Sequence, residues 1–148
     1  MVELGLLGLF IASFLSATLI PASSELVMVS LYFSGIEPLH LLLVATLGNS
    51  MGGFSGYLLG RYGLISLLEK YFSFSNNQFP SVLKIVRAYP LTSAFFCWLP
   101  IIGDFISIIL GVVKAKPISV LLLMTFGKAL RYGLILLATH KGWQWFNF

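Results

Sequence analysis

The sequence predicts an all-α integral membrane protein composed of two inverted-repeat units, each a re-entrant helical hairpin followed by a transmembrane helix. Three observations support this fold class: the composition, a recurrence of motifs 79 positions apart, and the distribution of basic residues. Of the 148 residues, 58% are hydrophobic and 9% are charged, against about 25% charged residues in a soluble domain. A soluble chain of this length buries too little surface to hide so much apolar material. We therefore expect one membrane domain over residues 1–148.

The first unit begins with an apolar segment that a proline and an acid interrupt. This segment, residues 1–36, contains Pro21 and Glu25, and we expect the whole segment to form re-entrant hairpin 1. Residues 38–60 are then apolar without a break, and about 20 residues suffice to cross the hydrocarbon core. After this predicted transmembrane helix, residues 61–87 mix apolar and charged side chains. This composition predicts an amphipathic link on the cytoplasmic membrane surface, in contact with anionic lipid.

The second unit repeats this order. Pro100 and Asp104 follow the corresponding residues of the first unit by 79 positions, and they interrupt residues 88–115, which we expect to form re-entrant hairpin 2. Each limb of this segment is shorter than about 20 Å as a helix, whereas the hydrocarbon core is about 30 Å thick. Residues 117–140 follow as an uninterrupted apolar segment, the second predicted transmembrane helix.

The basic residues indicate the orientation of the two units. If hairpin 2 returns to the side from which it enters, one face of the membrane receives a group of basic residues in and around the link. They are Lys70, Lys84, Arg87, Lys114 and Lys116. An excess of lysine and arginine marks the cytoplasmic side. Hairpin 1 then enters from the outer face and hairpin 2 from the inner face, so that the two units are inverted.

Glycines recur at every fourth residue of the first predicted transmembrane helix. They are Gly48, Gly52, Gly56 and Gly60. Residues at this spacing share one helix face, and small residues there let another helix approach closely. We expect this face to hold the hairpins against the helix, and the same face suits a homodimer.

A second group of residues is charged although its members lie within apolar segments. They are Glu25, Asp104, Lys128 and Arg131. An ionised side chain at membrane depth costs about 3 kcal/mol or more unless it is paired or hydrated. We expect these four residues to form one polar centre near the middle of the membrane, and we count Arg61, near the cytoplasmic end of the first transmembrane helix, with the same substrate and proton site.

Two interpretations of this polar centre remain open. In the structural one, Glu25 and Asp104 cap the second limbs of the hairpins and the bases neutralise them. In the functional one, the N-termini of those limbs, with Lys128 and Arg131, bind an anionic headgroup, while the acids bind and release protons. The residues that break the hairpins at this depth are Pro21, Pro100 and Gly103.

Other classes of site are disfavoured. Cys97 is the only cysteine, which excludes an intrachain disulfide and a zinc cage, so we expect no metal and no cofactor. The basic residues form no run, which disfavours nucleic acid as a partner. Gly53-Phe54-Ser55-Gly56 matches the G-x-S-G of rhomboid proteases, but His40 is about 20 Å away along the helix. Asp104 is the only aspartate, whereas intramembrane aspartyl proteases need two. We therefore expect no enzyme, with an intramembrane protease as a remote alternative.

Five motifs resemble those of a known family. They are Leu19-Ile-Pro21-Ala-Ser-Ser-Glu25, Gly48-Asn49-Ser50-Met-Gly52-Gly53, Gly60-Arg61, Trp98-Leu-Pro100-Ile-Ile-Gly103-Asp104 and Gly127-Lys128-Ala-Leu130-Arg131-Tyr132. In this order they resemble the DedA family of membrane proteins, also called VTT-domain or SNARE-associated proteins, and in particular its short YqaA-type branch. The resemblance implies two re-entrant hairpins that face each other and a role in moving lipids between leaflets. In the family, the proposed substrates are phospholipids and undecaprenyl phosphate, with proton coupling in some members.

The chain departs from the family at the second hairpin. Family members usually carry arginines three residues before and three after its proline, where this chain has Cys97 and Gly103. Our hypothesis is that Lys128 and Arg131 supply this charge. We expect a multi-pass protein of the bacterial inner membrane that acts as a flippase or scramblase for a phosphate-bearing lipid, with lipids of anionic headgroup as its partners. The alternative is a non-transporting membrane scaffold whose charges only pair.

Overall fold

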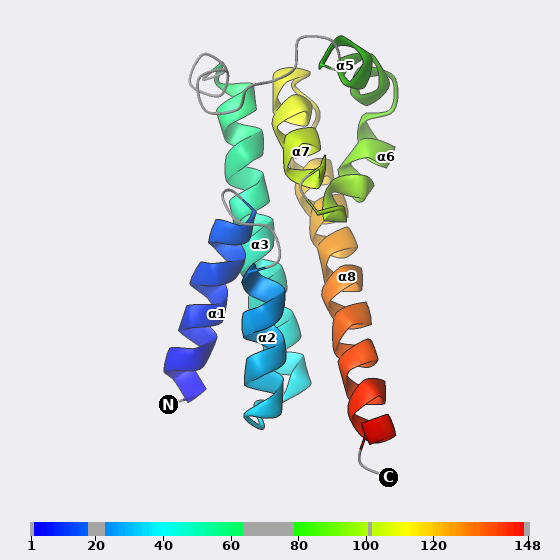
Figure 1. The fold of residues 1–148 in the computed structure, drawn as a ribbon. Helices are drawn as coiled ribbons and strands as arrows, with labels where there is room; N and C mark the ends of the chain where they lie inside the picture. Colours follow the sequence, from blue (N-terminus) through cyan, green and yellow to red (C-terminus); the bar gives the residue numbers. More distant parts are fainter. Residues whose placement is uncertain (1, 18–22, 64–78, 101, 147–148) are drawn as a thin grey trace. The chain divides into compact units, whose positions relative to one another are not determined.

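The computed structural model describes residues 2–17, 23–63, 79–100 and 102–146, and every regular element in these ranges is a helix. This confirms the predicted all-α class. The elements are α1 (Val2–Ser16), α2 (Ser23–Phe33), α3 (Pro38–Arg61), α5 (Phe79–Ala88), α6 (Pro90–Phe95), the short 3-10 helix η1 (Phe96–Trp98), α7 (Ile102–Val112) and α8 (Pro117–Phe146), as Figure 1 shows. The predicted hairpin break at Pro21 lies outside the described residues.

Helix boundaries recur along the chain at the spacing seen in the motifs. The bounds of α7, at 102 and 112, follow those of α2, at 23 and 33, by 79 positions each. The two long helices α3 and α8 begin at Pro38 and Pro117, again 79 apart. Proline suits a helix start because its missing N–H would have no partner there and its φ is already helical.

The turns that follow α2 and α7 are also alike. Gly35 has φ 87° and Lys114 has φ 54°, so both turns use the left-handed conformation. In both turns this residue donates to the carbonyl three positions back, and the next residue donates to the carbonyl five positions back, as in a Schellman cap. The bonds are Gly35 N to Tyr32 O (3.0 Å), Ile36 N to Leu31 O (3.2 Å), Lys114 N to Gly111 O (2.9 Å) and Ala115 N to Leu110 O (3.0 Å).

The chain folds into two compact units, and α3 and α8 contribute to both. Unit 1 contains residues 1–52 and 125–148, and unit 2 contains residues 53–124. Each unit has its own apolar core at corresponding positions of the chain. In unit 1 the core includes Leu41, Ala45 and Leu136, and in unit 2 it includes Val120, Met124 and Tyr57. Leu41 corresponds to Val120, Ala45 to Met124 and Tyr57 to Leu136, and the two residues of each pair are 79 positions apart.

Only one of the described helices is both long and apolar enough to cross a membrane, namely α8 over Pro117–Gln144. Its 30 residues continue to Phe146, beyond the predicted end at residue 140, where Trp143 packs on Phe33 of α2 with 5.1 Å between ring centroids. The 24 residues of α3 reach about 36 Å, but its glycines and polar side chains lower its hydropathy. The 11 residues of α2 and of α7 reach only about 17 Å each.

The first limb of the predicted hairpin 2 is divided into short helices. Tyr89, which precedes Pro90, has φ −131° and ψ 65° and separates α5 from α6. The ring of a proline clashes with a helical conformation of the residue before it, so the chain turns there. α6 and η1 then pack on α7. Of the predicted link over residues 61–87, the structure describes the two ends.

Candidate functional site

The glycines of α3 allow other helices to approach its backbone. In unit 1, a Cβ added at Gly48 would lie 2.6 Å from the carbonyl oxygen of Phe10, and one at Gly52 would overlap that of Phe14. Both carbonyls belong to α1, so α1 rests directly on α3. In unit 2, a Cβ at Gly60 would overlap the carbonyl oxygen of Ile108 in α7. The close approach of α1 brings its serines to the polar part of α3.

Buried polar side chains gather in unit 1. They are Ser13, Ser16, Ser24, Thr46, Asn49, Ser50 and Lys128. In unit 2 the described buried polar residues are Ser93 and Ser107, whose hydroxyls donate at 2.8 Å to the backbone carbonyls of Tyr89, just before α6, and of Asp104 in α7. Among the described residues, the larger group of buried polar side chains is therefore the one in unit 1, and its hydrogen bonds join different helices.

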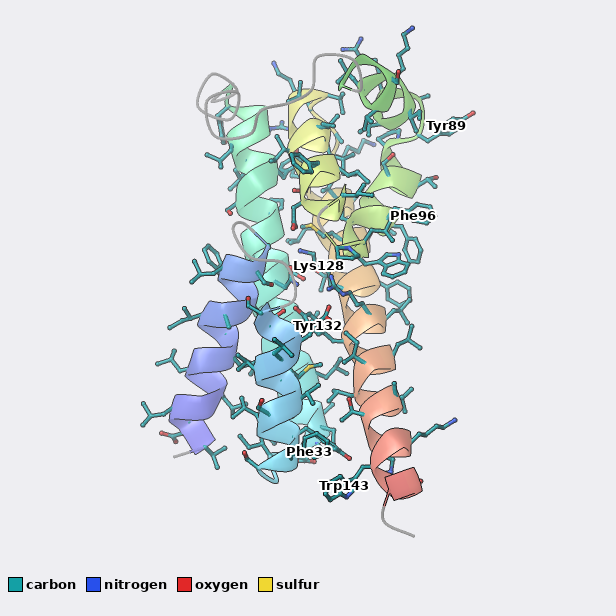
Figure 2. The ribbon with its side chains drawn as sticks, viewed as in Figure 1. Phe33, Tyr89, Phe96, Lys128, Tyr132 and Trp143 are labelled. Carbon is teal, nitrogen blue, oxygen red and sulfur yellow. The ribbon has the colours of Figure 1, made fainter. Side chains whose placement is uncertain are left out.

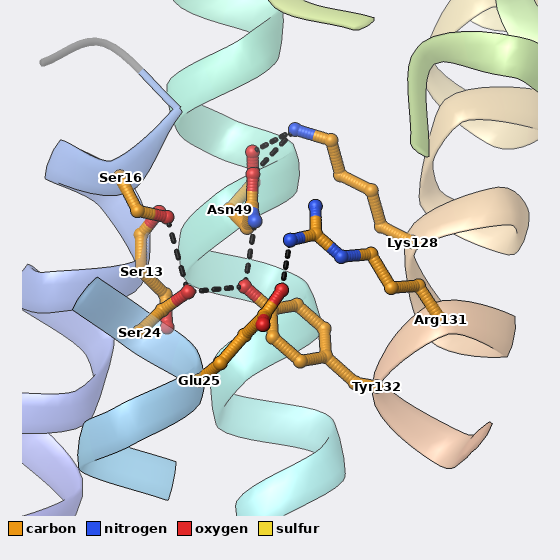
Figure 3. A network of polar contacts seen from close by, with 8 residues as sticks. All are labelled: Ser13, Ser16, Ser24, Glu25, Asn49, Lys128, Arg131 and Tyr132. Atoms are coloured by element: carbon orange, nitrogen blue, oxygen red, sulfur yellow. Dashed lines mark hydrogen bonds and ion pairs between the residues drawn. The ribbon is translucent and has the colours of Figure 1, made fainter. Parts of the chain in front are cut away.

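Lys128 anchors this interior (Figure 3). Its Nζ donates to the side-chain Oδ1 of Asn49 at 2.5 Å and to the backbone oxygen of Asn49 at 2.6 Å. An ammonium group can only donate, which fixes the amide oxygen of Asn49 toward Lys128 and the amide nitrogen away from it. That nitrogen donates to the hydroxyl of Tyr132 at 2.6 Å.

The network continues from Tyr132 to α1. Because the Tyr132 oxygen accepts from Asn49, its own hydrogen is available to Ser24 Oγ, 2.8 Å away. Ser24 Oγ lies 3.1 Å from Ser16 Oγ, which is also 3.0 Å from the backbone oxygen of Ser13. Side chains from α1, α2, α3 and α8 are therefore linked by one chain of hydrogen bonds (Figure 3). Linked hydrogen bonds in a low-dielectric interior polarise and strengthen one another.

An ion pair lies at the edge of this network. The guanidinium of Arg131 contacts the carboxylate of Glu25, which sits in the first turn of α2. The side chain of Glu25 is 28% exposed and that of Arg131 is 16% exposed, whereas Lys128 is 2% exposed. The pair is thus the more accessible part of the polar interior, and Lys128 is the deepest charged group.

The structure brings together three of the charged residues singled out in the sequence, Glu25, Lys128 and Arg131, in unit 1. It places Asp104 and Arg61 in unit 2. Asp104 lies in the first turn of α7 and is half-buried. The guanidinium of Arg61 donates to the hydroxyl of Tyr57 at 2.7 Å and to the carbonyl of Ala115 at 3.3 Å.

The second hairpin break has a close backbone contact. A Cβ added at Gly103 would overlap the carbonyl oxygen of Cys97, and Cys97 is itself buried at 2% exposure. The backbone at Pro100 accepts a bond from Ile102 N at 2.7 Å. A side chain as large as arginine at position 103 would therefore require this turn to open.

The uncharged members of the network, above all Asn49, Tyr132 and Ser24, were not predicted as site residues. A signal for two of them was present, because Asn49 is an amide within an apolar helix and Tyr132 follows Lys128 by one helical turn. Polar residues in such segments mark functional or structural contacts. Within the described ranges, no group of three His, Cys, Asp or Glu side chains is arranged to hold a metal ion.

Comparison with known proteins identifies relatives along nearly the whole chain. Two proteins named inner membrane protein YqaA, from Escherichia coli (strain K12) and Shigella flexneri, are each 34% identical to it over 145 residues, which is 97% of both chains. The chain belongs to the YqaA family. An uncharacterized protein of Haemophilus influenzae is 31% identical to this YqaA-family chain over 140 residues, 88% of this chain and 85% of its own length. No family model matches the chain, and neither does any solved structure.

This membership confirms the resemblance to the YqaA-type branch that the motifs indicated. It also confirms two predictions, that the chain is a membrane protein and that it is found in the inner membrane, because the YqaA relatives are named as inner membrane proteins. The YqaA-family chain is therefore a protein of the inner membrane.

Proposed function

We propose that this protein moves a phosphate-bearing lipid, a phospholipid or undecaprenyl phosphate, between the leaflets of the inner membrane as a flippase or scramblase. The observation that carries the proposal is the polar interior of unit 1, where Arg131 and Lys128 of α8 meet Glu25 and Asn49. Charged groups at membrane depth are costly and mark substrate pathways. The coupled movement of protons through Glu25 and Asp104 is part of the proposal.

The Glu25–Arg131 pair supports an exchange of anions. Glu25 lies in the first turn of α2, where N–H groups of the helix lack intrahelical partners and the helix dipole favours negative charge. A phosphate that took the place of the carboxylate would meet the same guanidinium and the same helix end. Arginine binds carboxylate and phosphate with the same planar set of donors. In this proposal Glu25 occupies Arg131 in the resting protein, and the headgroup replaces it.

We further propose the inverted-repeat architecture, with α3 and α8 crossing the membrane and with re-entrant hairpins formed by α1–α2 and by α6–α7. The recurrence of helix bounds, caps and core positions at 79 residues supports it. Asn49 and Lys128, which bond to each other, are also 79 positions apart, as expected where a two-fold axis relates two copies. Inverted repeats with broken helices are a common architecture of transporters.

A non-transporting scaffold is the second candidate. One observation favours it, namely that Glu25 and Arg131 are partners of each other and that Asn49 accepts two bonds from Lys128. Polar groups that already have partners within the protein can hold a fixed structure together without binding a ligand. The two candidates differ in what removal of the charges does, since a scaffold loses its stability and a transporter loses its activity.

The test is a leaflet-exposure assay with the purified protein in lipid vesicles that carry fluorescent phospholipids or labelled undecaprenyl phosphate. Transport predicts that Glu25→Gln and Arg131→Gln lose translocation while they still insert and keep their melting temperature. Lys141→Gln is the matched control, because Lys141 is an exposed base on the same helix α8. No translocation above empty vesicles with any of the headgroups would refute transport, and loss of folded protein in both variants would support the scaffold.

A further inference from the structure

Two helix pairs at corresponding positions of the chain, α2–α8 in unit 1 and α7–α3 in unit 2, pack with the same positions in contact. In unit 1, α2 packs beside α8, and the hydroxyl of Tyr32 lies 2.7 Å from Nδ1 of His140. In unit 2, α7 packs beside α3, and Gly111 lies against Arg61, whose backbone nitrogen would be 2.7 Å from an added Cβ. Gly111 and Arg61 are the positions 79 residues from Tyr32 and His140. The two interfaces can therefore be compared position by position.

The α7–α3 interface is closed by backbone contacts. A Cβ at Gly60 of α3 would overlap the carbonyl oxygen of Ile108, and one at Gly111 of α7 would overlap that of Tyr57. Each helix thus presents a glycine to the backbone of the other. Contacts of this kind leave no space for a ligand, and they cannot loosen by rotation of side chains.

The α2–α8 interface consists of side chains instead. Four pairs hold it: Ser24 with Tyr132, Glu25 with Arg131, Tyr32 with His140 and Phe33 with Trp143. The last pair lies at the ends of the two helices (Figure 2). Long side chains can change rotamer or exchange partners while the helices move apart, and three of the four contacts are polar. This interface can therefore open at lower cost than its counterpart in unit 2.

The surroundings of this interface suit a lipid that arrives from the side. Leu26 of α2 is 72% exposed and Leu134 of α8 is 63% exposed, so both helices present apolar surface next to the Glu25–Arg131 pair. Exposure falls from this pair to Lys128 in the interior. A headgroup whose tails stay on the apolar surface would meet Arg131 first and the Tyr132–Asn49–Lys128 network next.

We propose that the anionic headgroup of the lipid enters unit 1 laterally between α2 and α8, with the α2–α8 interface as the part that opens and the α7–α3 interface as the part that stays closed. This inference rests on the proposed function, because it takes a phosphate-bearing lipid as the ligand. It adds the route of the ligand and assigns different roles to two helix pairs that occupy corresponding positions of the chain.

The test uses pairs of cysteines in a Cys97→Ala background. One variant carries Tyr32→Cys with His140→Cys across the α2–α8 interface. The control variant carries Gly56→Cys with Ser107→Cys across the α7–α3 interface, where a Cβ on Gly56 would lie 3.1 Å from Ser107 Oγ. The α2–α8 pair is bridged in vesicles with a short, reducible bis-methanethiosulfonate, and the α7–α3 pair, whose packed interface has no room for a reagent, is oxidised to a direct disulfide. Lipid translocation is measured before bridging, after bridging and after reduction.

We expect the α2–α8 bridge to abolish most translocation, because a step that needs an interface to open stops when the interface is held closed, with recovery on reduction, and the α7–α3 bridge to leave the rate unchanged. Equal slowing by both bridges, or none by the α2–α8 bridge in a protein that translocates lipid, would overturn the lateral route while the proposed function stands. Absence of translocation before bridging would refute the proposed function instead.

A second measurement does not depend on transport. The rate of bridging is compared in vesicles of phosphatidylcholine alone and in vesicles that also contain phosphatidylglycerol, whose headgroup carries the phosphate charge. We expect the anionic lipid to slow bridging of the α2–α8 pair severalfold, because the headgroup holds the helices apart, and to leave the α7–α3 pair unaffected. Equal rates for the α2–α8 pair in both vesicles would overturn the inference.

Discussion

Replacement of Gly60 by alanine tests the close packing of α3 on α7. The added Cβ would overlap the carbonyl oxygen of Ile108 and lie 3.0 Å from its carbonyl carbon. Both are backbone atoms, so no rotamer change relieves the contact and the helices must separate. Overpacking of this kind costs about 1–3 kcal/mol. We expect the variant to be less stable than the wild type by this amount.

A matched control exists on the other long helix. Gly133 lies within α8, and a Cβ added there would meet nothing within 4 Å. Gly133→Ala should therefore stabilise the protein by about 0.5–1 kcal/mol, since alanine has less freedom to lose in a helix. For a chain of this size, each kcal/mol corresponds to about 2–4 °C in melting temperature, so the two alanine variants should differ by roughly 3–16 °C.

The chain contains its own reporter for this measurement. Cys97 is the only cysteine, and it is buried at 2% exposure in the core of the unit that contains Gly60. A fluorogenic maleimide in detergent solution should label it only as this unit unfolds. If Gly60→Ala melts at the same temperature as Gly133→Ala, or above it, the backbone contact between α3 and α7 is not what holds these helices together.

Three further predictions concern the network and the caps. Asn49→Leu should destabilise the protein by about 3 kcal/mol, because it leaves the buried ammonium of Lys128 without its amide acceptor. Adding Lys128→Met to this variant should recover most of the lost stability. A double variant no more stable than Asn49→Leu would contradict this expectation. Tyr132→Phe should cost about 1 kcal/mol, the net worth of a buried hydrogen bond, in the same thermal assay; an unchanged melting temperature would show that its hydroxyl adds nothing. Lys114→Gly should raise stability by about 1 kcal/mol, because Lys114 has φ 54° and only glycine adopts the left-handed region without strain; Lys116→Gly, at an exposed position with ordinary backbone, should not raise it.

Much of the fold could be predicted because local signals determine it. Proline starts depend on one residue each, so the predicted starts of the two long helices agree with Pro38 and Pro117, where α3 and α8 begin. The end of α8 was less predictable. The helix continues to Phe146, where contacts such as Phe33 with Trp143 come from another helix. The break at Tyr89 was also missed, although the proline that follows it was a sufficient local signal.

The partners of the charged residues could not be predicted from the sequence. Lys128 and Arg131 are three residues apart and share a helix face, so either could have paired with Glu25. In the structure Arg131 forms an ion pair with Glu25, and Lys128 donates a hydrogen bond to Asn49. This choice depends on the depth and lateral position of α2 and α3 against α8, which the hydropathy of the segments does not encode.

The sequence by itself determined that this is an all-helical membrane protein whose motifs recur 79 residues apart, because composition, this recurrence and the family motifs are properties of the chain. Only the tertiary structure decided that the corresponding helix pairs α2–α8 and α7–α3 differ in kind. In unit 2 glycines close α7 onto α3, whereas in unit 1 polar and aromatic side chains separate α2 from α8. The physical reason is that a contact between helices depends on both of its partners, and these are more than 40 residues apart in the chain for every pair that defines the two interfaces.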